Sequence, residues 1–148
     1  LGWWVMPSET PQMLADEYAI KEGGLPVLMG TDPRVMDAIM NAYKQDDLAT
    51  ADQLLELSIL QDPTNDTLLY FTGVVMDREK KYEQAAAVYA RIPGGSVFAL
   101  RAMYRGALCA LQENKKDQAR ALLQRVAAGT DAQLSERAED LLERLSRL

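Results

Sequence analysis

The sequence contains no histidine and a single cysteine, Cys109. Without histidine, the chain lacks the commonest general base, every Ser-His or Cys-His nucleophile system and every histidine-containing metal site. One cysteine excludes a disulfide within the chain and a cysteine-rich zinc site. The small apolar neighbours of Cys109 indicate a buried, unreactive thiol. These absences argue against an enzyme, and we predict no catalytic residue, no metal site and no cofactor.

Glycine-rich phosphate loops are absent as well. The Gly-Gly pairs at 23–24 and 94–95 are isolated and lack the flanking pattern that such a loop requires. The acidic pairs at 46–47 and 139–140 fall in a predicted turn and on a predicted helix surface. Catalytic carboxylates must instead converge on one pocket with shifted pKa values. The charged residues therefore predict no hydrolytic site either.

No apolar run in the sequence approaches the roughly 20 residues that a membrane-spanning helix needs. The first seven residues, LGWWVMP, contain two adjacent tryptophans. Because tryptophan is enriched at membrane interfaces, we interpret Trp3 and Trp4 as the exit of a membrane helix upstream of Leu1. The alternative is a start peptide whose tryptophans pack onto the domain. The absence of disulfides is compatible with a reducing cytoplasm and with a bacterial periplasm.

Acidic residues outnumber basic ones, and the net charge of −6 argues against a general nucleic-acid binder. The charge is uneven along the chain. Residues 1–66 carry three Lys and Arg against twelve Asp and Glu, whereas residues 67–148 carry thirteen against ten. Ordinary solvated helix surfaces account for this distribution. The alternative is a polarised surface that steers a charged partner.

Three segments of the chain align without gaps, and the alanine that ends each one recurs every 34 residues. These alanines are Ala51, Ala85 and Ala119. Large apolar residues follow at the same spacing, namely Leu55, Tyr89 and Leu123. Small side chains let two helices approach closely, and large ones fill the space beside them. The alanines are therefore predicted to be packing positions rather than a site.

This period and pattern resemble the tetratricopeptide repeat (TPR), in which each unit is a pair of antiparallel helices. The middle unit matches best, with Gly73 at the small-residue position of the first helix and Tyr82 as the aromatic before the second. The outer units depart from the pattern. Ile39 replaces the small residue in the first unit, and the repeat-ending proline is present only as Pro63. The resemblance covers roughly residues 33–130.

The predicted fold class is all-α, a right-handed α-solenoid of three TPR-like helix pairs with an N-terminal helix and a C-terminal capping helix. Residues 1–32 are the N-terminal segment with a short helix and a docking loop, 33–130 are the three repeats (33–64, 65–95 and 96–130), and 131–148 are the capping helix. Helices are predicted at 11–22, 33–45, 48–61, 65–79, 81–92, 96–112, 115–128 and 131–147. Polar residues before the first turns, such as Asp32 before Pro33, indicate helix starts.

The resemblance implies that the first helix of each pair lines a concave groove. The predicted partner-binding residues are Met36, Met40, Tyr43, Tyr70, Phe71, Val74, Arg78, Arg101, Tyr104, Arg105 and Leu108. Some TPR proteins bind a C-terminal carboxylate through polar residues, but Met, Tyr, Val and Leu stand at the matching positions here. We therefore predict an apolar and aromatic trough with the three arginines to one side, suited to an extended strand or an amphipathic helix. For each residue the alternative is ordinary inter-helix core.

These features predict a non-catalytic interaction module, a scaffold or adaptor, whose partner is a protein or peptide segment rather than nucleic acid. The layout, including the LADEY sequence at 14–18, also resembles the soluble TPR domain of bacterial single-pass membrane proteins. That resemblance implies a tether upstream of residue 1 and a location in the cell envelope, on the periplasmic face of the inner membrane. The alternative is a cytoplasmic assembly or chaperone-like protein that self-associates.

Surplus apolar sequence outside the repeats suggests that the chain fills part of its own groove. We hypothesise that the loop at 25–29, or the Trp3-Trp4 segment, packs against the first repeat or its groove.

Overall fold

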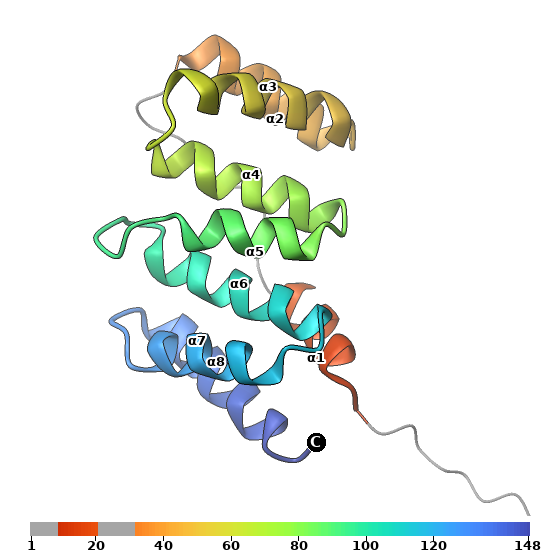
Figure 1. Ribbon diagram of the computed structural model, residues 1–148, viewed down its shortest axis with the longest axis vertical. Coiled ribbons are helices and arrows are strands. Elements are labelled where there is room, and N and C mark those ends of the chain that lie inside the picture. The colour runs from red at the N-terminus through yellow and green to blue at the C-terminus, as the bar shows by residue number, and fades with distance from the viewer. Residues whose placement is uncertain (1–8, 21–31) are drawn as a thin grey trace, which may run out of the picture.

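The computed structural model describes residues 9–20 and 32–148, and these residues form eight α-helices and no strands. The helices are α1 (Pro11–Ile20), α2 (Pro33–Lys44), α3 (Leu48–Gln61), α4 (Asp66–Arg78), α5 (Tyr82–Ala90), α6 (Ala99–Gln112), α7 (Lys116–Ala127) and α8 (Ala132–Leu145). Three antiparallel pairs, α2–α3, α4–α5 and α6–α7, stack along the long axis, and α8 follows the last pair (Figure 1). The predicted all-α solenoid with an N-terminal helix and a C-terminal capping helix is confirmed.

The turn inside each pair has the same backbone geometry. Its central residue has a positive φ, and the three such residues are Asp46 (60°), Lys80 (62°) and Asn114 (57°). The N–H of the next residue donates to the carbonyl five residues earlier. These bonds are Asp47 to Ala42 at 2.8 Å, Lys81 to Met76 at 2.9 Å and Lys115 to Ala110 at 2.8 Å. This bond pattern ends a helix with a left-handed residue. The 34-residue period of the sequence is therefore also a period of the backbone.

The repeating alanines are packing positions, as predicted. Ala51, Ala85 and Ala119 are all fully buried. The position of Gly73 has an equally direct cause, because a Cβ there would lie 2.3 Å from the ring of Tyr89. The α4 backbone can therefore approach α5 only without a side chain at this position.

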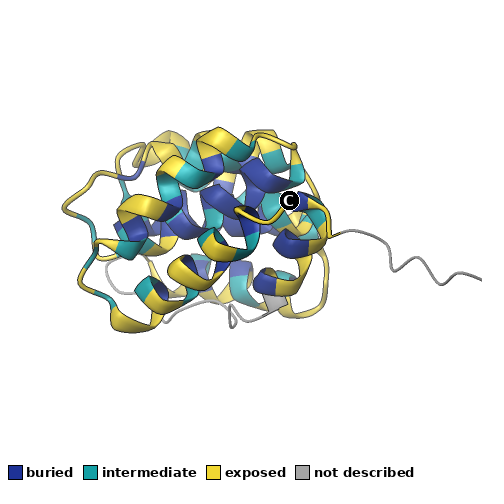
Figure 2. Ribbon diagram, turned by 90° about the horizontal axis from the view of Figure 1, so that it is seen from below, coloured by how far each residue is buried: buried dark blue, intermediate teal, exposed yellow. Residues whose placement is uncertain are grey.

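Buried residues lie on the inward faces of the helices, and exposed residues lie on the outside (Figure 2). Helix α8 covers the last pair with an apolar stripe, which is Leu134, Ala138, Leu141 and Leu145. This stripe joins one core cluster with Leu123 and Val126 of α7. The capping helix therefore does what its sequence predicts: it covers a face of α7 that has no further repeat beside it.

Helix α6 begins three residues later than predicted. Ser96, the predicted cap, accepts a hydrogen bond from the Phe98 N–H at 3.0 Å in the turn before the helix. Its hydroxyl also donates to the Asp66 carboxylate at the start of α4. This second bond places the starts of α4 and α6 side by side, so the two helices run in the same direction.

Helix α1 packs on α6. Its buried residues Leu14, Ala15 and Tyr18 belong to the core cluster that contains α6, α7 and α8. The first helix of the chain therefore lies against the last repeat. The loop at 25–29 and the Trp3-Trp4 segment, for which the sequence suggested self-docking, lie outside the described residues.

Candidate functional site

The structure divides the eleven predicted groove residues by their accessibility. Six are buried, namely Met36, Tyr70, Phe71, Val74, Tyr104 and Leu108. Three are half-buried, namely Met40, Tyr43 and Arg105, and Arg78 and Arg101 are exposed. A partner that meets the chain in this conformation therefore reaches five of the eleven side chains.

Two of the buried residues hold α4 in place. Phe71 lies in a core cluster with Leu55 and Leu68, between α3 and α4. The Tyr70 ring stacks on Phe98, with centroids 4.9 Å apart and planes 15° apart. Removing either ring would therefore disturb the packing of helices as well as any partner contact.

Tyr43 and Arg78 come together where α2 and α4 end. The Arg78 guanidinium lies 4.7 Å from the centre of the Tyr43 ring and 3.1 Å from the Asp46 carboxylate. Both charged side chains are well exposed, so this ion pair is screened by solvent. The arginine is held over an aromatic surface that a partner can reach.

Arg105 takes part in a more buried polar group between α4 and α6. Its Nε donates to the Tyr70 hydroxyl at 2.9 Å, and its Nη1 lies 3.9 Å from Oδ2 of Asp77. Burial raises the pKa of Asp77, and the positive charge of Arg105 opposes this rise. Burial also raises the pKa of the neighbouring Cys109 thiol, which is 1% exposed. The prediction of a buried cysteine is confirmed, and its thiol is held in the neutral form.

Arg101 does not join the other two arginines. It lies in the first turn of α6, whereas Arg78 is the last residue of α4. Since α4 and α6 run in the same direction from adjacent starts, Arg101 and Arg78 lie at opposite ends of this helix pair.

Helix α1 covers the face of α6 that carries Tyr104 and Leu108. Tyr104 and Leu108 lie in the same core cluster as Leu14, Ala15 and Tyr18 of α1. The assignment of Tyr104 and Leu108 to a partner-binding groove stays a prediction, and sequence reasoning did not identify α1 as the helix that covers them. The sequence feature that could have predicted this cover is the spacing of Leu14, Ala15 and Tyr18, which puts them on one face of a helix.

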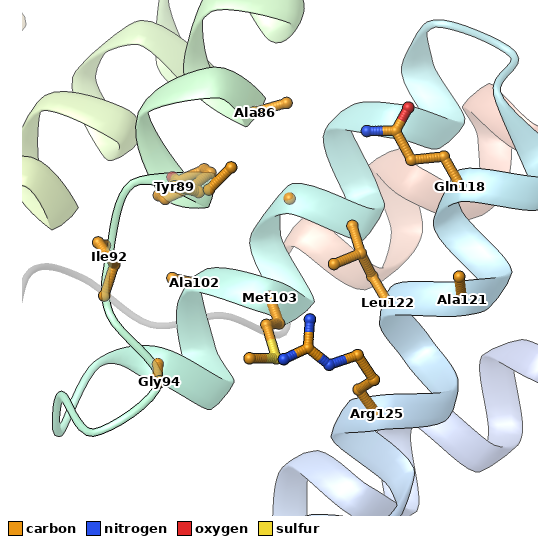
Figure 3. A pocket seen from close by; sticks show the side chains of 13 residues that line it. Ala86, Tyr89, Ile92, Gly94, Ala102, Met103, Gln118, Ala121, Leu122 and Arg125 are labelled. Atoms are coloured by element: carbon orange, nitrogen blue, oxygen red, sulfur yellow. The ribbon is translucent and has the colours of Figure 1, made fainter.

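A pocket of about 410 Å³ lies between α5 and α7, over α6 (Figure 3). Tyr89, Met103, Leu122 and Arg125 line it together with small residues such as Gly106. It lies on a different side of α6 from α1, since Gly106 and Leu108 are two helical positions apart. None of its lining residues is a carboxylate or a thiol.

Within residues 9–20 and 32–148, no cluster of three or more potential metal-ligating His, Cys, Asp or Glu side chains occurs. None of the helices in the same part of the chain combines the length and apolar character needed to cross a membrane.

No protein-family model matches the chain, and no curated protein matches it. Several solved structures resemble its fold, including the following two. The first is PcrH in complex with the chaperone binding region of PopD, with a TM-score of 0.69, 21% identity, and coverage of 82% of this chain and 98% of that one. The second is the type III secretion translocator chaperone SycD of Yersinia enterocolitica, in an alternative dimer, with a TM-score of 0.67, 18% identity, and coverage of 77% and 90%.

The fold class follows from these matches and from the repeated helix pairs. The chain is an all-α, TPR-like helical-repeat protein. At identities near 20%, the likeness to PcrH and SycD establishes the shared architecture.

Proposed function

We propose that this protein is a non-catalytic, chaperone-like module that binds a segment of a partner protein on its concave side. The observation that carries the proposal is the likeness to PcrH, which extends over 98% of the PcrH chain. The structure of PcrH was solved with a bound segment of another protein, PopD. The likeness to SycD, a chaperone by its description, points the same way. Both favour the chaperone-like alternative over the membrane-tethered scaffold, and the proposal requires no tether.

The side chains on the concave side support binding without catalysis. Met40 and Tyr43 give a half-buried surface of flexible and aromatic groups, which adapts to varied apolar partners. Arg78 and Arg101, at opposite ends, add exposed positive charge for orienting an acidic segment. These four residues are the proposed contact set as the chain is folded, and Tyr70 and Tyr104 serve mainly as core.

Site-specific photocrosslinking tests this proposal. A photoreactive amino acid at Met40 or Arg101 of the full chain, expressed in its native host, should crosslink one dominant protein. The matched control is Gln124, an exposed residue of α7 on the outer side. Crosslinks that are equally strong from Gln124 would contradict a concave binding site.

Charge reversal then measures the contribution of the two arginines to binding. Arg78→Glu with Arg101→Glu should weaken binding of the recombinant partner segment about tenfold or more, because exposed charges orient a charged partner. Arg120→Glu with Arg125→Glu, an equal change of charge on α7, should leave the affinity within about twofold. Isothermal titration gives both values, and equal losses in the two proteins would count against the assignment.

Self-association remains a second candidate because of one observation on α3. Leu57 and Leu60, one turn apart, are 60% and 74% exposed. Contiguous exposed apolar surface is typical of protein–protein interfaces, and these two leucines would be the centre of one. Light scattering should detect a dimer whose population rises with concentration and which Leu57→Gln with Leu60→Gln abolishes. A monomer at every concentration would remove this candidate.

A further inference from the structure

We propose that the concave side of α6, together with the adjoining part of α8, is a helix-binding surface that α1 occupies as a built-in competitor. The external ligand that fits it is an acidic amphipathic helix with the residue spacing of α1. This inference rests on the proposed function, and it names the chemistry of the partner and a means of regulating access to the site.

The apolar half of the contact is that of a helix docked in a groove. Leu14, Ala15 and Tyr18 are 1%, 1% and 0% exposed, although they belong to a helix of only ten residues. Their spacing of i, i+1 and i+4 puts them on one face. That face meets an apolar surface formed by Tyr104, Leu108, Leu111 and Leu141. A helix with an apolar face of this spacing is the expected ligand of such a surface.

The polar half of the contact specifies acidic residues beside the apolar face. Arg144 of α8 pairs with Glu17 at 2.9 Å and with Glu9, and its guanidinium lies 5.7 Å from the centre of the Tyr18 ring. The Tyr18 hydroxyl donates to the Asp140 carboxylate. The Arg144 side chain therefore contacts the Glu17 carboxylate and the Tyr18 ring of α1, and the Glu9 carboxylate just before that helix.

The far edge of α1 is fixed by amide groups at the end of α6. The Gln112 side chain donates to Asp16 Oδ1 at 2.5 Å, and the Gln12 side chain donates to the Gln112 carbonyl at 3.5 Å. The surface thus holds an apolar strip between an arginine on one edge and an amide donor on the other. In the sequence LADEY, each of the two acids meets its own edge.

Helix α1 is separable from the repeat array. Helices α2–α7 make the three pairs and α8 caps them, so α1 completes no repeat. An isolated helix of ten residues is marginal in water, so α1 depends on the surface it covers. Twelve residues, 21–32, separate it from α2 in the sequence. A short connection gives a tethered group an effective concentration of about 1 mM, which holds a weak ligand in place and still allows a stronger one to displace it.

A labelled peptide tests the surface directly in the full-length protein. The probe is a fluorescein-labelled peptide with the sequence of residues 9–20, ETPQMLADEYAI. The releasing variant carries Leu14→Glu and Tyr18→Gln, which remove the apolar face of the tethered helix and leave α2–α8 unchanged. If the intrinsic dissociation constant is about 100 μM, loss of the tethered competitor should strengthen peptide binding about tenfold.

Three controls define the result. A peptide that carries the same two substitutions should not bind. Met13→Glu, on the exposed side of α1, should leave peptide binding as weak as in the wild-type chain, since Met13 is 47% exposed. Arg144→Ala added to the releasing variant should cost most of the gained affinity.

The proposal is overturned if the releasing variant, folded by circular dichroism, binds the peptide no more tightly than the wild-type chain. A dimer that exchanges α1 between copies would also overturn it, because the ligand would then be a second copy. If the releasing variant unfolds, cleavage of the wild-type chain at a protease site inserted within 21–31 replaces it. The labelled peptide should then exchange with the cleaved α1 segment, and a failure to exchange rejects the proposal.

The two proposals fail separately. Loss of partner capture with intact peptide binding would reject the proposed function and leave the surface in place. Partner capture without any peptide binding to the released chain would reject only the helix-binding surface.

Discussion

The two ends of the solenoid are built from the same repeat and are finished differently. At the C-terminal end, α6 is enclosed by α5, α7, α1 and part of α8, and nine of its residues are buried. At the other end, α2 has three buried residues. Within the described residues, no helix covers the outer side of the first pair, and α3 exposes Leu57 and Leu60 there.

This difference shows that the repeated sequence sets the geometry of each helix pair, whereas the helices packed against a pair contribute most of its stability. All three pairs share the left-handed residue at the turn and the fully buried alanine. They differ in how many helices contact them on the outside. In a solenoid each unit contacts only its neighbours, so an end without a cap gains less burial than an end with one.

The largest expected effect comes from breaking the capped end. Leu141→Ala should lower the free energy of unfolding by about 3 kcal/mol, because Leu141 is fully buried between α8 and the last pair. Leu60→Ala, the same change at the open end, should cost less than about 0.5 kcal/mol. Urea unfolding followed by circular dichroism measures both. Similar losses at the two sites would remove the distinction between the ends.

Most of the fold was accessible from the sequence because its signals are local. Proline after a capping residue starts α2, and the Asp32 side chain accepts from the Arg34 N–H at 3.0 Å as such a start requires. The 34-residue period is carried by small residues at close contacts, where side-chain volume limits the choice. Each helix bound that the structure describes lies within three residues of its predicted place.

The position of α1 was not accessible, because periodicity gives the direction of a face and not what covers it. The LADEY sequence suggested a likeness to membrane proteins, whereas in the structure Leu14, Ala15 and Tyr18 pack on α6. Tyr70 of α4 and Tyr104 of α6 illustrate the same limit. Their phase points them inward, but only tertiary contacts show that both are almost fully buried.

A smaller effect on stability is expected from alanine substitution of two glycines, Gly73 of α4 and Gly106 of α6. Both residues are buried, but the free space around them differs. Gly73→Ala should destabilise the protein by about 2 kcal/mol, since the new Cβ would overlap the buried Tyr89 ring. Gly106→Ala should stabilise it by about 0.5 kcal/mol, because Gly106 is helical and its Cβ would meet only ordinary contacts, the nearest at 3.8 Å. Thermal unfolding of the two variants measures the difference. If both substitutions destabilise the protein, then burial of the glycine, and not the free space around it, determines the change in stability.

The smallest expected effect is a change of stability with pH, and it arises where the second and third helix pairs meet. There Asp77 of α4 faces Arg105 of α6. Burial raises the pKa of Asp77 above its ordinary value of 3.8, although the Arg105 charge opposes the rise. The folded chain therefore takes up this proton at a higher pH than the unfolded chain. The ionised group destabilises the fold at neutral pH, and this penalty shrinks as the pH falls through the folded pKa toward 3.8.

Two variants test the direction of the Asp77 pKa shift and the role of Arg105 in it. The free energy of unfolding of the wild-type chain, relative to Asp77→Asn, should increase as the pH falls through that range. Arg105→Met should raise the pKa of Asp77 further, because it removes the charge that opposes the rise and keeps much of the side-chain volume. Carbon-detected NMR titration of the Asp77 carboxyl measures the pKa directly. A wild-type value at or below 3.8 would mean that the Arg105 charge and the hydrogen bonds to the Asp77 carboxyl together outweigh the effect of burial on its pKa.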